Sequence, residues 1–75
     1  MPSAAAQDRK TAHDWLRRAL LSYQRYRASG KPPLLARAAV EADEALEHAA
    51  KVGDHGRLVG IIQRKLDKVA KVARP

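Results

Sequence analysis

Residues 29–33 read Ser-Gly-Lys-Pro-Pro, and this stretch separates two helical patterns in the chain. Glycine commonly ends a helix in a left-handed conformation, and proline disfavours helix at the residue before it. Proline nevertheless suits the first turn of a helix, where its missing N–H group is not needed. The stretch therefore predicts that one helix ends at Ser29-Gly30 and that another begins at Pro33.

Before this break, apolar residues recur at the three-and-four spacing of one helix face. This first stripe comprises Ala12, Trp15, Leu16, Ala19, Leu20, Tyr23 and Tyr26. It predicts a helix over roughly residues 5–28. Two residues are candidate N-caps, Ser3 for a long helix and Thr11 for a shorter one.

Two further stripes follow the break. The second comprises Leu35, Ala38, Ala42, Ala45, Leu46, Ala49 and Val52, and the third comprises Leu58, Ile62, Leu66, Val69 and Ala73. Between them, Gly53 offers a left-handed C-cap and Asp54 an N-cap. The pattern predicts helices over roughly residues 33–52 and 55–73, joined by about two residues.

The three stripes predict an all-α fold, a small three-helix bundle that runs up-down-up with a tight hairpin between the second and third helices. We expect residues 1–75 to form one domain, with disorder over 1–6 and joints at 29–32 and 53–54. The side chains expected to be buried are Trp15, Leu20, Leu46, Ile62 and Leu66.

The second joint has one more specific interpretation. Ala49, Gly53, Val59 and Ile62 stand at the offsets of the small residue, turn glycine and core residues of helix-turn-helix proteins. Residues 45–64 therefore resemble that family in part, although His48 and Asp54 replace expected apolar residues. The same joint is similar to the helix hairpins of tetratricopeptide-type arrays. We favour a simple hairpin.

Charge is segregated along the chain in the same three blocks as the helical patterns. Residues 1–31 carry seven Lys or Arg against two Asp, residues 32–54 carry two against five acidic residues, and residues 55–75 carry six against one. The formal net charge is +7 and the calculated pI is about 10.4. Pairing between neighbouring helices would account for the acidic residues but would leave an excess of positive charge, which attracts polyanions.

Eight basic residues are candidates for contact with nucleic acid or with an acidic partner. They are Arg17, Arg18, Arg25 and Arg27 in the first helix and Arg57, Arg64, Lys68 and Lys71 in the third. Gly56 and Gly60 offer bare backbone beside them, either to a phosphate or to a closely crossing helix. Among the aromatic residues, Tyr26 is the candidate for a contact role.

The sequence carries no motif that would make the chain an enzyme. Gly53, Gly56 and Gly60 do not form a phosphate-binding loop, and we assign no catalytic residue. Cysteine is absent, and Glu44 with His48 lacks the second histidine of a zinc-binding helix, so we expect no metal and no cofactor. The N-terminal stretch does not have the pattern of a signal peptide, and we expect a cytoplasmic protein without a membrane partner.

We therefore expect a non-catalytic protein that binds the phosphate backbone of DNA or RNA. The alternative is a protein–protein interaction or regulatory adaptor module that docks on an acidic partner. Adsorption of the basic third helix to an anionic membrane ranks below both.

The chain has 75 residues and no disulfide, so its core must be small, and we predict a homo-oligomer, with a homodimer as the simplest case. If folding and association are linked, the thermal midpoint should rise with protein concentration over about a hundredfold range. Circular dichroism melting at several concentrations measures this. A constant midpoint would indicate a self-sufficient monomer.

Overall fold

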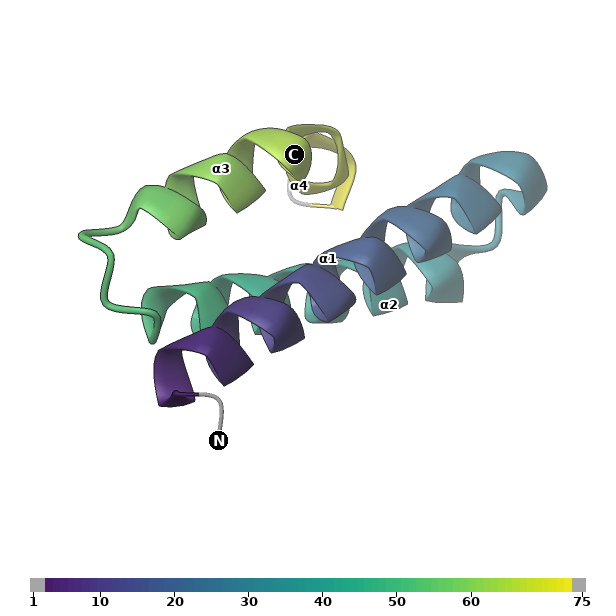
Figure 1. Cartoon of the computed structure of the whole chain (residues 1–75). Helices are drawn as coiled ribbons and strands as arrows, with labels where there is room; N and C mark the ends of the chain where they lie inside the picture. Colours follow the sequence, from purple (N-terminus) through teal and green to yellow (C-terminus); the bar gives the residue numbers. More distant parts are fainter. Residues whose placement is uncertain (1–2, 74–75) are drawn as a thin grey trace.

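The computed structural model describes residues 3–73, which form four helices (Figure 1). These are α1 (Ala4–Ser29), α2 (Pro32–Ala50), α3 (Arg57–Lys65) and α4 (Asp67–Ala73). No residue from 3 to 73 lies in a strand, so the all-α prediction is confirmed. Figure 1 shows α1 and α2 side by side, with α3 and α4 lying over them, and the chain reverses direction at both joints.

The ends of α1 are set by Ser3 and Gly30. The Ser3 hydroxyl accepts a hydrogen bond from the Ala6 N–H at 3.1 Å, so Ser3 and not Thr11 caps the helix. Gly30 takes φ +70° and donates its N–H to the Tyr26 carbonyl at 2.6 Å, as predicted for the C-terminal cap. Residues 3–6, where we expected disorder, hold this cap and the first turn of α1. Residues 1–2 lie outside the described chain.

The joint between α2 and α3 is longer than expected. It covers residues 51–56, and Gly53, His55 and Gly56 all have positive φ. Asp54 lies inside the joint, where its carboxylate accepts the Leu58 N–H at 3.0 Å. The extra residues allow Val52 to stay buried while the chain turns. Six residues also exceed the turn of about three or four that helix-turn-helix proteins use.

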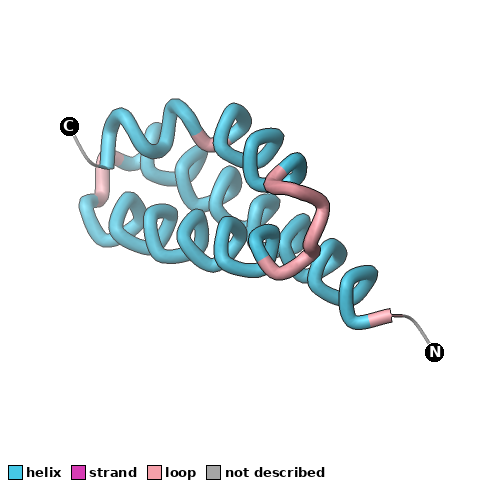
Figure 2. Tube along the Cα trace, turned by 90° about the vertical axis from the view of Figure 1, so that its left-hand side faces the viewer, coloured by secondary structure: helices cyan, strands magenta, loops and turns pink. Residues whose placement is uncertain are grey.

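The third predicted helix is divided at Leu66, so the described chain has four helices where we expected three. Leu66 has φ −95° and ψ 4°, outside the regular helical values. Its side chain is buried, as is that of Val69 in the following helix. Figure 1 shows α4 nearly end-on where α3 runs across the view, and Figure 2 shows the break between them. Val69 of α4 is buried together with the apolar stripe of α3, and we call α3 with α4 the C-terminal arm.

The core contains twelve buried apolar residues, and half of them are alanine. They are Ala12, Leu16, Ala19, Ala38, Ala42, Ala45, Ala49, Val52, Leu58, Ile62, Leu66 and Val69. All three stripes therefore face inward. The predicted burial of Ile62 and Leu66 is confirmed, whereas Trp15, Leu20 and Leu46 are only partly buried against the core. So few helices cannot cover every side of a large side chain at the edge of its stripe.

The helices are not packed equally against one another. α1 and α2 make the most extensive contact, and both parts of the C-terminal arm approach α2 more closely than α1. Small alanine side chains on α2, among them Ala38, Ala45 and Ala49, permit this close packing. The arm therefore stands away from α1, and longer side chains of α1 such as Leu20 and Tyr23 line the space between.

Gly60 lies inside α3, but no helix crosses closely there. A Cβ atom built on Gly60 would meet nothing within 4 Å, which excludes close crossing as the reason for this glycine. Gly56 has φ +79° and belongs to the joint, so the two glycines do not form one bare groove along a helix. Gly60 instead leaves open backbone next to Arg64 on the surface of the arm.

Replacement Gly60→Ala should raise the free energy of unfolding by about 0.5–1 kcal/mol, because glycine loses more conformational entropy in a helix than alanine. Gly30→Ala is the matched control. Since Gly30 has φ +70°, alanine there should destabilise the protein by about 1–2 kcal/mol. Urea unfolding followed by circular dichroism measures both values. A loss of stability in Gly60→Ala would contradict the prediction, because it would mean that other protein atoms pack against α3 at Gly60.

Candidate functional site

A hollow of about 390 Å³ lies between α1 and the C-terminal arm. Leu20, Tyr23, Gln24 and Arg27 line it from α1, and Arg64, Lys65, Asp67 and Lys68 line it from the arm. It exists because the arm packs on α2 and leaves α1 at a greater distance. We call it the basic hollow, since it joins cations from the first and third charge blocks.

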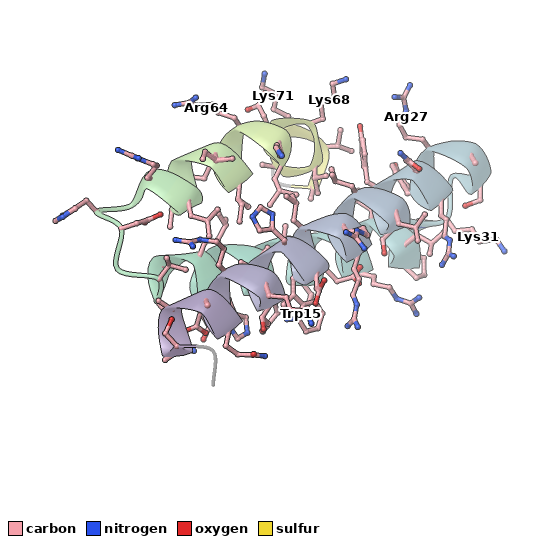
Figure 3. All side chains as sticks on the ribbon, in the orientation of Figure 1. Trp15, Arg27, Lys31, Arg64, Lys68 and Lys71 are labelled. Carbon is pink, nitrogen blue, oxygen red and sulfur yellow. The ribbon has the colours of Figure 1, made fainter. Side chains whose placement is uncertain are left out.

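Four cations surround the basic hollow: Arg27, Arg64, Lys65 and Lys68. In Figure 3, Arg27, Arg64 and Lys68 lie along the same upper side of the molecule, and Trp15 lies on the opposite side of α1. All four side chains are exposed. Within the described residues none of them has a carboxylate within 4 Å. The positive charge is therefore available to a ligand.

The acidic residue of the basic hollow is already paired. Asp67 Oδ2 lies 2.9 Å from Lys71 Nζ, one helical turn along α4. The hydrogen bond to Asp67 and its negative charge raise the pKa of Lys71 above the ordinary 10.5. Because Asp67 is matched by Lys71, it does not neutralise the other four cations. Lys71, one of the predicted contact residues, instead balances an acid of its own helix.

Acidic side chains at the interface of α1 and α2 contact serine and histidine, not arginine or lysine. The buried Ser22 hydroxyl donates to Glu41 at 2.5 Å. His48 lies between two carboxylates, with Asp8 Oδ1 at 3.3 Å from Nδ1 and Glu44 Oε2 at 3.9 Å from Nε2. Glu41 and Glu44 therefore contact Ser22 and His48, and neither neutralises a cation of the basic hollow.

The structure separates the predicted contact residues into several groups. Arg27, Arg64 and Lys68 meet in the basic hollow, but the other arginines do not join them. Arg17 lines a separate hollow of α1, together with Arg9, Lys10, His13 and Asp14. The Arg18 guanidinium lies over the Trp15 ring, 4.9 Å from its centroid. Arg25 and Arg57 are exposed and do not line the hollow.

Sequence reasoning predicted three of the eight residues that line the basic hollow and missed the other five: Leu20, Tyr23, Gln24, Lys65 and Asp67. Tyr23 was assigned to the core, and it is indeed half-buried against it, yet it also lines the hollow. Tyr26, the aromatic residue that we favoured for contact, does not line it but lies 6.5 Å from Tyr23, ring centroid to ring centroid. Lys65 is close to the apolar stripe of α3, and only the position of α1 shows that it faces the hollow.

Neither a metal site nor a membrane span is found in the described residues. From residue 3 to residue 73, no group of three or more His, Cys, Asp or Glu side chains is arranged to hold a metal ion. None of the four described helices combines the length and apolarity needed to cross a bilayer. The basic hollow is the site where cations from both basic blocks of the chain meet.

No protein-family model, no curated protein and no solved structure matches this chain.

Proposed function

We propose that this chain is a non-catalytic nucleic-acid-binding protein that contacts phosphates through the basic hollow. One observation carries the proposal. Arg27 of α1 and three cations of the C-terminal arm surround a single hollow with no carboxylate partner among the described residues. The protein has a formal net charge of +7, so its long-range field favours polyanions, as do the cations of the basic hollow.

A linear polyanion fits the distribution of charge along α1. Arg9, Lys10 and Arg17 lie on one face of its N-terminal half, and Arg27 reaches the basic hollow near its C-terminal end. At a rise of about 1.5 Å per residue, Arg9 and Arg27 are roughly 27 Å apart along the helix axis. Nucleic acid supplies negative charge at regular intervals over such a length. In this proposal the C-terminal arm is the third element of an up-down-up bundle, and the protein is cytoplasmic.

A second candidate function is a protein–protein interaction or adaptor module that docks on an acidic partner. The observation that favours it is an apolar groove of about 280 Å³ between α2 and the C-terminal arm, lined in part by Leu46, Val69 and Ala70. Exposed Val40 and Val72 add apolar surface on the same two elements. An apolar groove is more typical of protein or peptide docking than of contact with phosphates.

The double substitution Arg64→Glu with Lys68→Glu should weaken nucleic-acid binding while the fold is retained. Glutamate near the C-terminus of α3 is mildly unfavourable and in the first turn of α4 mildly favourable, so the two effects on helix stability offset each other. Each lost phosphate contact should lower the slope of log affinity against log salt by about 0.9 for duplex and about 0.7 for single strands. Electrophoretic titration against DNA, RNA and heparin at two salt concentrations measures this.

The matched control is Arg25→Glu with Arg37→Glu. It changes the net charge by the same amount on exposed residues that do not line the basic hollow. The control should keep most of the affinity, apart from a general loss due to lower net charge. Equal losses in both variants would mean that the hollow is not a specific contact surface. No loss in Arg64→Glu with Lys68→Glu would leave the protein-docking function as the better explanation.

A further inference from the structure

Tyr23 gives the basic hollow an aromatic wall in addition to its cations. Its side chain is half-buried, packs against the core and lines the hollow together with Leu20. The Tyr26 ring lies next to it, with 6.5 Å between the ring centroids. An aromatic ring in a hollow that Arg27 and the cations of the C-terminal arm also line can contact more than phosphate.

We infer that the basic hollow receives an unpaired nucleobase and that the protein's ligand is single-stranded nucleic acid. The inference rests on the proposed function and specifies its substrate class. Proteins that bind single strands combine a positively charged groove with aromatic side chains on which bases stack. Here Tyr23 supplies the aromatic surface, and Arg27 and Lys68 supply positive charge at opposite walls of the same hollow, for the phosphates on either side of the base.

The lining of the hollow favours a base over a phosphate group alone. Its volume of about 390 Å³ leaves room for a base. Its wall is partly apolar, with Leu20 and the Tyr23 ring on the α1 side. A phosphate gains nothing from an apolar wall, whereas a base is stabilised by burial and by stacking.

Gln24 provides a group that can recognise the edge of the base. Its side chain lines the basic hollow next to Tyr23, and an amide both donates and accepts hydrogen bonds. Hydrogen bonds to the exposed edges of unpaired bases are the usual means of recognition in single strands. In a duplex the Watson–Crick edge of each base is occupied by its partner, so Gln24 could meet only the edges that face the grooves.

The structure also lacks a clear means of reading duplex DNA. The six-residue joint between α2 and α3 differs from the short turn that positions a recognition helix in the major groove. In a duplex the bases are stacked inside, and only phosphates would reach the rim of the basic hollow. Binding to duplex would therefore use the cations and leave the Tyr23 wall without a contact.

The test measures the binding of the 75-residue chain to dye-labelled oligonucleotides by fluorescence anisotropy. The ligands are a DNA strand, the RNA strand of the same sequence, the matching duplex, and a DNA strand in which abasic sites replace the bases. One stacked base is expected to favour the intact strand over the abasic strand by about 5- to 100-fold. The duplex should bind more weakly than the single strand, and the difference between RNA and DNA identifies the natural strand.

Two substitutions at Tyr23 test the aromatic wall directly. Tyr23→Phe keeps the ring and should bind the intact strand as the wild type does. Tyr23→Leu keeps an apolar side chain but removes stacking, so its affinity should fall about 5- to 100-fold for the intact strand and remain unchanged for the abasic strand. Circular dichroism and Trp15 fluorescence check the fold of both variants. The abasic comparison needs only the wild-type protein, so the test stands even if Tyr23→Leu unfolds.

The outcomes separate this inference from the proposed function. If the wild type binds intact strand, abasic strand and duplex equally, and Arg64→Glu with Lys68→Glu weakens all three, the base site is overturned and phosphate binding stands. If the wild type binds none of these ligands, both are overturned. A preference for the intact strand that is lost in Tyr23→Leu and kept in Tyr23→Phe establishes the base site.

Discussion

Close packing of α1 on α2 is the contact on which the rest of the structure depends. Alanine supplies half of the buried apolar residues, and so small a side chain lets two long helices approach along most of their length. The hydrogen bond from Ser22 to Glu41 and the contact of His48 with Asp8 add polar links between the same helices. The hairpin of α1 and α2 is therefore the platform on which the C-terminal arm rests.

The arm is too short to cover this platform evenly. Leu58, Ile62, Leu66 and Val69 bury their side chains, and the arm bends at Leu66. Because the arm approaches α2 more closely than α1, the larger side chains of α1, Leu20 and Tyr23, are left at the edge of the core. The basic hollow is thus a consequence of how an alanine-rich helix pair packs with a short, bent arm.

The same packing explains why the positive charge is concentrated. Glu41 and Glu44 contact groups at the interface of α1 with α2, and Asp67 contacts Lys71 on its own helix. These contacts leave Arg27, Arg64, Lys65 and Lys68 without carboxylates among the described residues, although like charges in proximity repel one another. An anionic ligand would relieve this repulsion, and the proposed binding of nucleic acid would therefore stabilise the fold.

The sequence alone determined the helical class, the inward stripes, the end of α1 at Gly30 and the basic character of the third block, because spacing, capping and charge are local properties. It could not give the length of the second joint or the break at Leu66, since Val52 and Leu66 are buried in these places and packing against other helices is not a local property. It also predicted Arg27, Arg64 and Lys68 without showing that they meet. Only the tertiary structure joined them with Tyr23 and Lys65 in one hollow, because that depends on where the arm stands relative to α1.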